Sequence, residues 1–265
     1  FQPPWVSSPN PGGVFFNPLP QAICLAIFSG WCAFNLCRAD QRNLYRLLFL
    51  IGLALSTWAV FEVSHQRLGA LTWAIMVGGG CISQMPKRWR WKGAVFIVFA
   101  VAVFLFSNDA LRERTLLGIH ELQFYDHKSD YSSIGARLHM WAAAWSGIQE
   151  APFFGHGAGS YSRLAERFFA DPVMCAIGCP YPHQQYLLIW VESGVVGLLL
   201  YLGVLALIAR YHLRHSGFNP LALPLLTVVF SAGFVDSLFW YRGYLYLFVP
   251  LLGLLMIRQP SQNGV

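Results

Sequence analysis

Charged residues are scarce in this chain of 265 residues: they make up 11% of it, whereas hydrophobic residues make up 56%. An average soluble domain carries roughly 25% charged residues. The composition therefore excludes an ordinary soluble domain and predicts a membrane protein. The formal net charge is +6, but the basic residues form short clusters between apolar runs and no continuous stripe, which argues against nucleic-acid binding.

The opening of the sequence shows neither a methionine nor the pattern of a secretion signal. It opens at Phe1 with a proline-rich, uncharged segment, residues 1–19, that has no positive N-terminal region and no small-residue cleavage site. We therefore expect a further part of the protein upstream of this segment.

Motifs for a tightly held metal are also missing. The sequence contains no Asp-x-Asp, no His-Glu-x-x-His and no ligand spacing of cysteines and histidines. We therefore expect metal-independent chemistry without a cofactor.

Cysteine is sparse and mostly uninformative. Four of the six cysteines lie in or beside apolar runs, where cysteine behaves as a small core residue. The other two, Cys175 and Cys179, lie in a polar loop. They could pair across one turn if the loop faces an oxidising compartment, or remain free thiols, and the sequence leaves both alternatives open.

Seven apolar runs of nearly membrane-spanning length divide the chain. They cover residues 22–37, 44–60, 68–82, 93–107, 185–209, 221–235 and 244–257. Arginine and lysine follow the first, third, fifth and seventh runs, so the positive-inside rule places these connections in the cytoplasm. The predicted fold is an all-α polytopic membrane protein with about seven transmembrane helices in this chain.

The same rule places the longest connection outside the cytoplasm. We therefore expect three parts: residues 1–107 with an outer N-terminal segment and four spans, the loop 108–184, and residues 185–265 with three spans. Within the loop, apolar residues at three- and four-residue spacing predict an amphipathic helix over 134–148. Its expected apolar face carries Leu138, Trp141, Trp145 and Ile148. A glycine-rich turn and a second helix, 160–170, follow.

His183 lies where this loop passes into the fifth apolar run. An imidazole can act as acid or base near neutral pH, and from this position it could reach a hydroxyl on the aqueous side. Counting 100° per residue predicts that Gly194 lies deeper on the same face of one helix and that Glu192 lies on the opposite face. An interfacial histidine that merely caps the helix is the alternative. Glu192 would be a carboxylate inside the membrane, either protonated or paired within the bundle.

Two arginines are candidates for holding an anion. Arg67 is the only fixed charge between residues 63 and 85 and stands at the outer end of the third run. An arginine fork there can hold a phosphate, although a snorkelling arginine needs no function. Arg137 lies near the start of the amphipathic helix, where a cation is disfavoured unless an anion is bound. A solvated loop arginine is the alternative for Arg137.

Three further positions are candidate substrate-binding residues: Gly157, Arg163 and Arg242. Gly157 belongs to the glycine-rich turn, which could offer backbone N–H groups to a phosphate or could be a tight structural turn. Arg163 lies on the second loop helix. Arg242 and Asp236, in the last outer turn, could form a structural pair or the rim of a site.

Several of these residues together resemble landmarks of the O-antigen ligase superfamily, which includes WaaL-type ligases, pilin O-oligosaccharyltransferases and Wzy-type polymerases. The landmarks are Arg67-x-x-x-Leu71, Arg137-Leu138-His139-Met140-Trp141, Pro152-Phe153-Phe154-Gly155-His156-Gly157, His183, and Glu192-Ser193-Gly194-Val195-Val196-Gly197-Leu198. Gln184 departs from the superfamily pattern, in which an asparagine often follows the histidine.

The resemblance implies a GT-C-like bundle in the bacterial inner membrane, with a large periplasmic loop partly laid on the bilayer. It implies a polyprenyl-pyrophosphate-linked glycan, such as an undecaprenyl pyrophosphate glycan, as donor. The acceptor would be a hydroxyl of lipid A-core or of a protein serine or threonine. By the family pattern, Arg67 and Arg137 would hold the pyrophosphate and His183 would act as base, without a metal and with inversion of the anomeric carbon.

Two alternatives remain open. A Wzy-type polymerase would use a second lipid-linked glycan as its acceptor. A lipid or solute transporter belongs to another class and should carry polar groups near the bilayer midplane. Here the charges cluster at the outer surface, with Glu192 as the exception, which favours chemistry there over transport.

Overall fold

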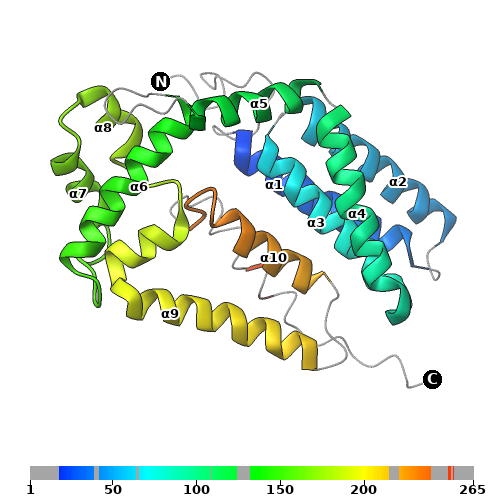
Figure 1. The fold of residues 1–265 in the computed structure, drawn as a ribbon. Coiled ribbons are helices and arrows are strands. Elements are labelled where there is room, and N and C mark those ends of the chain that lie inside the picture. Colours follow the sequence, from blue (N-terminus) through cyan, green and yellow to red (C-terminus); the bar gives the residue numbers. More distant parts are fainter. Residues whose placement is uncertain are drawn as a thin grey trace, which may run out of the picture. The chain divides into compact units, whose positions relative to one another are not determined.

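The computed structural model describes residues 18–38, 42–63, 66–107, 109–123, 132–214, 221–239, 250–251 and 253. These residues form helices and connecting turns, with no strand among them (Figure 1). The all-helical class is therefore confirmed for this part of the chain. The chain divides into two compact units. The first contains Phe1–Arg112, His212–Val228 and Leu247–Val265, and the second contains Glu113–Tyr211 and Val229–Tyr246.

Helices occupy the first six predicted apolar runs. They are α1 (Pro18–Leu36), α2 (Asn43–Trp58), α3 (Arg67–Gln84), α4 (Lys87–Ser107), α9 (Gln185–Arg214) and α10 (Ala222–Ala232). α2 continues into a π-helix, η1 (Ala59–Val63).

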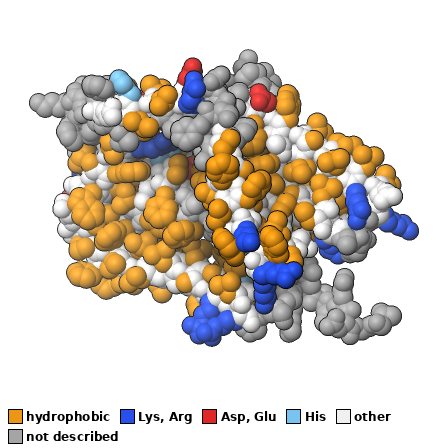
Figure 2. Space-filling view, turned by 45° about the vertical axis from the view of Figure 1, so that its right-hand side comes forward, with side chains coloured by type: hydrophobic (Ala, Val, Ile, Leu, Met, Phe, Trp, Pro, Cys, Tyr) orange, Lys and Arg blue, Asp and Glu red, His pale blue; other side chains and the backbone are white. Residues whose placement is uncertain are grey.

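Two of the described helical segments, Asn43–Val63 and Gln185–Arg214, are long and apolar enough to cross a membrane. Hydrophobic side chains cover much of the face seen in Figure 2. The seven-span arrangement stays a prediction, and most of its seventh run, 244–257, lies outside the described residues.

In the first unit, α1 and α3 pack closely because glycines lie at their contact. A Cβ atom at Gly30 would lie 2.6 Å from the Cβ of Met76, and one at Gly69 would lie 2.6 Å from the Cβ of Ala22. Small residues at a helix contact let two backbones approach each other, which is how apolar helices associate where water supplies no driving force.

The predicted loop 108–184 is largely helical. It contains α5 (Asp109–Gln123), α6 (Ser133–Glu150), α7 (Ser160–Phe168) and α8 (Pro172–Gly178). The second predicted loop helix corresponds to α7, and the preceding turn has positive φ at three glycines, 155, 157 and 159. α6, α7 and the first part of α9 share a buried core: Ala144, Ile148, Tyr161, Leu164, Ala165, Cys179, Leu188 and Val191.

α6 buries a face other than the predicted apolar one. Of the four residues expected on that face only Ile148 is buried, and Trp145 is 49% exposed. The buried face carries mainly small residues: Gly135, Ala136, Met140, Ala143, Ala144, Gly147 and Ile148. A Cβ atom at Gly147 would lie 3.0 Å from Cδ1 of Leu164, so the small side chains bring α6 close to α7. The spacing of the large apolar residues did not predict this buried stripe of small residues.

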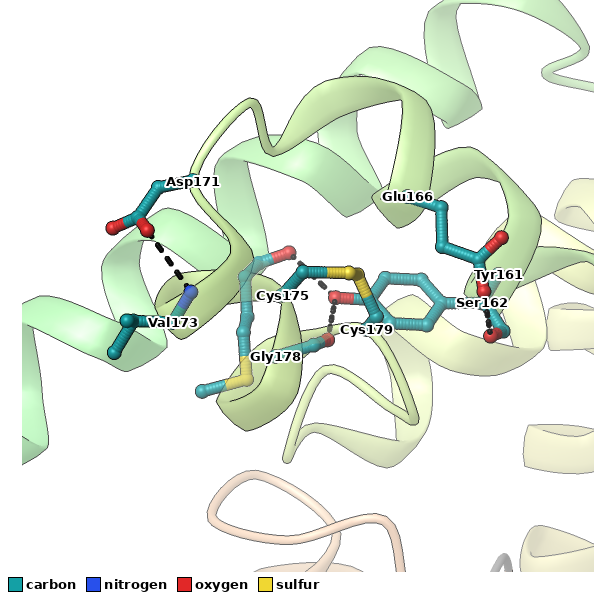
Figure 3. Close-up of a disulfide and its surroundings, with 9 residues drawn as sticks. Tyr161, Ser162, Glu166, Asp171, Val173, Cys175, Gly178 and Cys179 are labelled. Atoms are coloured by element: carbon teal, nitrogen blue, oxygen red, sulfur yellow. Dashed lines mark hydrogen bonds between the residues drawn. A yellow bond between two sulfur atoms is a disulfide. The ribbon is translucent and has the colours of Figure 1, made fainter.

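Cys175 and Cys179 form a disulfide at the end of α8 (Figure 3). Beside it, the buried hydroxyl of Tyr161 lies 3.1 Å from the carbonyl oxygen of Gly178 and 3.4 Å from that of Met140. Burial raises the pKa of Tyr161, so the hydroxyl keeps its proton and donates at neutral pH. This tyrosine therefore links α7 to both α6 and α8.

Reduction of the disulfide is expected to lower the thermal stability of the second unit. A cross-link that closes so short a loop contributes about 2 kcal/mol in the chain-entropy model. Dithiothreitol should therefore lower the melting temperature of the purified protein in detergent. The matched variant Cys175→Ser/Cys179→Ser should melt at the lower temperature with or without the reductant. A variant that still responds to dithiothreitol would contradict this assignment.

Candidate functional site

His183 lies two residues before the start of α9 and has an unusual backbone conformation. Its φ is 48°, which is the only positive value among the described non-glycine residues. The left-handed region is rare for such residues, although histidine enters it more readily than most, and residues held there cluster at functional sites. Because His183 lies outside the helix, the predicted shared helical face with Gly194 is wrong.

Asp236 holds the imidazole of His183. The Nδ1 atom of His183 lies 3.0 Å from Oδ1 of Asp236, and the two side chains are 27% and 2% exposed. The same carboxylate oxygen accepts the backbone N–H of Ser237 at 2.9 Å. Nε2 of His183 has no hydrogen-bond partner within the described part of the chain. This nitrogen can therefore make a further hydrogen bond.

The contact between Asp236 and His183 was not predicted from the sequence. The sequence suggested that Asp236 either pairs with Arg242 or lies with it at the rim of a site. Asp236 and His183 are 53 residues apart, and the only available signal was that the predicted topology places both on the outer side. Arg242 lies outside the described residues.

Backbone contacts fix the chain after the histidine. The N–H of Gln184 donates to Oγ of Ser237 at 3.1 Å, and the N–H of Gln185 donates to the carbonyl oxygen of Gly233 at 2.8 Å. The side-chain oxygen of Gln184 also accepts the N–H of Leu187 in the first turn of α9. This is the capping contact that an asparagine makes at a helix N-terminus. Gln184 therefore acts as the N-cap of α9.

Trp141 fixes the chain before the histidine. Its indole N–H donates to the carbonyl oxygen of Pro182 at 3.1 Å. Arg137 lies one turn earlier in α6, and residues four apart share a helix face. Arg137 therefore lies on the side of α6 that contacts the loop before α9, which contains Pro182 and His183. Among the described residues its guanidinium has no hydrogen bond or ion pair.

The helix-dipole argument for an anion near Arg137 is not supported. Arg137 is in the second turn of α6, where the dipole effect is already weak. The N-terminus of α6 is occupied by the protein's own groups: Ile134 N–H donates to Oε2 of Glu121 at 3.1 Å, and Gly135 N–H donates to Oγ of Ser132 at 3.0 Å.

The other sequence candidates do not gather around His183 through any measured contact. Arg67 begins α3, and its side chain lies outside what the structure describes. Arg163 is exposed on α7. The N–H of Gly157 donates to the carbonyl oxygen of Glu192 at 2.8 Å, which favours the structural interpretation of the turn. The proposed roles of these residues stay predictions.

α9 is broken at Gly194, where φ is 67° and ψ is −175°, and the yellow ribbon bends in Figure 1. A break leaves carbonyl groups before it and N–H groups after it without helical partners. Residues 152–157, here called the bridging loop, supply the missing partners. The bonds run from His156 N to Val191 O (2.9 Å), Gly157 N to Glu192 O (2.8 Å), Val195 N to Pro152 O (2.9 Å) and Val196 N to Phe153 O (3.3 Å).

Two glycines make this contact possible. A Cβ atom at Gly194 would lie 2.0 Å from the carbonyl oxygen of Phe153, and one at Gly155 would lie 2.5 Å from the carbonyl carbon of Glu192. Glu192 also accepts the N–H of Gly159 at 2.9 Å, so its carboxylate caps the positive end of α7. The Glu192 carboxylate thus has a structural role. The sequence motifs at residues 152–157 and 192–198 form one structural unit.

In the described part of the chain these features define an all-helical architecture with membrane-span candidates and a histidine oriented by a buried carboxylate. The sequence model of the O-antigen ligase family matches residues 51–202, a range that includes Arg67, Arg137, His183 and the bridging loop. The chain therefore belongs to the O-antigen ligase family. This family is membrane-associated in bacteria.

A protein of Haemophilus influenzae (strain ATCC 51907 / DSM 11121 / KW20 / Rd), described as uncharacterized, is 25% identical over 163 residues. The match covers 57% of this chain and 41% of that protein. The chain thus spans about two fifths of the length of the curated relative it matches.

Proposed function

We propose that this chain carries the catalytic part of an inner-membrane glycan transferase. It would move an oligosaccharide or O-antigen from polyprenyl pyrophosphate to a hydroxyl of lipid A-core or of a protein serine or threonine, on the periplasmic side. The spans would form a GT-C-like bundle in the three parts 1–107, 108–184 and 185–265. The observation that carries the proposal is the 3.0 Å contact between His183 and Asp236.

In this mechanism His183 is the general base. Asp236 accepts the Nδ1–H of the ring, so Nε2 carries the lone pair that takes the proton of the acceptor hydroxyl. The carboxylate then stabilises the imidazolium that forms. The hydroxyl oxygen attacks the anomeric carbon, the bond from that carbon to the pyrophosphate oxygen breaks, and its electron pair leaves with polyprenyl pyrophosphate. Attack from the opposite face inverts the anomeric centre.

The leaving pyrophosphate gains negative charge in the transition state, and arginines can stabilise it without a metal. Support for Arg137 comes from its guanidinium, which has no partner among the described residues and lies one turn from Trp141. Arg67 is assigned by its match to the family pattern.

Arg137→Ala is expected to lower kcat/KM for the lipid-linked donor by about 10²–10³-fold, the usual cost of removing one group that stabilises developing charge. Arg137→Lys should recover part of this loss, because lysine keeps the charge without the bidentate fork. Transfer would be measured in vesicles containing EDTA. Arg210→Ala, at an exposed position near the end of α9, is the matched control and should transfer normally. An unchanged kcat/KM in Arg137→Ala would remove this arginine from the mechanism.

The acceptor is tested by offering lipid A-core, pilin and a second lipid-linked glycan separately to the full-length protein. Transfer to either of the first two supports the ligase or oligosaccharyltransferase proposal. A product from the second glycan alone would make the protein a Wzy-type polymerase. Movement of the donor across the vesicle membrane without any new glycosidic bond would support the transporter alternative.

A further inference from the structure

Exposed aromatic side chains gather where α9 breaks. Phe153 and Phe154 of the bridging loop are 66% and 79% exposed. Trp145 is 49% exposed and packs edge-on against Trp190 with the ring centroids 5.9 Å apart. The indole N–H of Trp190 donates to the carbonyl oxygen of Pro152 at 3.1 Å, which joins this pair to the bridging loop. The proposed chemistry uses none of these side chains.

The two parts of α9 have different surroundings. Before the break, Leu188 and Val191 belong to the buried core that α9 shares with α6 and α7. After the break, many apolar side chains point outward: Val196, Leu199, Leu200, Val204 and Leu207 are 42–67% exposed. Residues 195–214 extend about 30 Å at 1.5 Å per residue, and Arg210 and Arg214 at their end can extend their charged groups to the opposite surface of a bilayer whose hydrocarbon is about 30 Å thick. The second part alone is therefore long enough to span the membrane.

We propose that the periplasmic surface of the bilayer meets α9 at the Gly194 break, and that Phe153 and Phe154 insert there among lipid headgroups and upper acyl chains. Residues 185–193 then stand outside the bilayer with α6, α7 and α8. The membrane span begins near residue 195 instead of residue 185. This inference rests on the membrane location in the proposed function and adds a lipid-binding surface to it.

A bilayer suits this surface for two reasons. The exposed Phe153 is bonded through its carbonyl oxygen to the N–H of Val196, the first of the exposed apolar residues after the break, and aromatic residues are favoured at the membrane interface. The bridging loop also has its carbonyl groups at Pro152 and Phe153 bonded to α9. A loop that enters an apolar layer with unpaired backbone groups pays several kcal/mol for each, and these bonds remove that cost at the point of entry.

A lipid-exposed label tests the surface. The free cysteines Cys24, Cys32, Cys37 and Cys81 would be replaced by alanine in the full-length protein, and the disulfide kept oxidised. An environment-sensitive fluorophore is attached to Phe154→Cys or to Ala158→Cys, which is also exposed but lies beyond the bridging loop. In proteoliposomes, phospholipids with a nitroxide near the headgroup should remove most of the fluorescence at 154 and little at 158.

Other outcomes overturn the proposal. Quenching of the label at position 154 by aqueous iodide, without quenching by the nitroxide lipid, would show that the phenylalanines lie in water. Shielding from both quenchers would indicate a protein partner, and a response to added polyprenyl pyrophosphate without nitroxide quenching would indicate the donor tail.

The position of the membrane surface has its own test. Ser193→Cys should react with a membrane-impermeant maleimide added from the periplasmic side, and Leu200→Cys should not. If neither cysteine reacts, the span begins near residue 185, as the sequence predicted. If both cysteines react, this part of α9 does not lie in the membrane. Transfer is assayed separately: correct labelling with no transfer by the unlabelled protein would retain this surface and reject the proposed function, and the reverse pattern would do the opposite.

Discussion

His183→Asn is expected to lower glycan transfer by about 10²–10⁴-fold, the usual contribution of a general base. Asparagine tolerates the left-handed backbone that His183 adopts, and its amide N–H can still donate to Asp236. The variant therefore keeps the loop and the contact with the carboxylate but cannot accept a proton. Transfer to the preferred acceptor would be followed by separating lipid-linked donor from product.

Two further measurements on the His183→Asn variant serve as controls. Its melting temperature and its affinity for the lipid-linked donor should match those of the unaltered chain, because neither depends on the lone pair of Nε2. Transfer at the normal rate would remove His183 from the mechanism, and a large fall in melting temperature would point to a structural role.

Gly194→Ala is expected to cause the largest structural loss. A side chain at a φ of 67° is strained, and its Cβ would lie 2.0 Å from the carbonyl oxygen of Phe153. Relief of this clash requires the bridging loop to move, which breaks its bonds to α9. We expect a loss of about 3 kcal/mol or more, visible as a lower melting temperature and as proteolysis within α6–α8.

Gly203→Ala is the matched control in the same helix. A Cβ atom at Gly203 meets nothing within 4 Å. Alanine there should leave stability unchanged or raise it by about 0.5–1 kcal/mol, since glycine is the poorer helix former. Similar behaviour of the two variants would contradict the role assigned to the break.

The apolar runs located the helices because their signal is local. The predicted runs 22–37, 68–82 and 185–209 fall in α1, α3 and α9 except for Cys37, which follows α1, and His183 was placed correctly at the junction before α9. The break at Gly194 was not foreseen, because the run stays apolar across it and periodicity reads side chains without the backbone angle. A continuous helix was therefore the natural but incorrect expectation.

The contacts of the site depend on residues far apart in the chain, which pattern reasoning cannot pair. Asp236 reaches His183 across 53 residues, and Glu192 reaches Gly159 across 33. For Glu192 the sequence left open a protonated carboxyl or one paired within the bundle, and the structure pairs it with the N–H of Gly159 at the start of α7. Such pairings are set by how the helices pack, so they became visible only in the fold.

A double-mutant cycle on His183 and Asp236 tests the central claim most directly. Asp236→Asn replaces a buried carboxylate by a near-isostere that can still accept the N–H of Ser237. If Asp236 acts through His183, Asp236→Asn should lower kcat, and the double variant should transfer no worse than His183→Asn alone. Losses that multiply in the double variant, or normal transfer by Asp236→Asn, would contradict a histidine base oriented by this carboxylate.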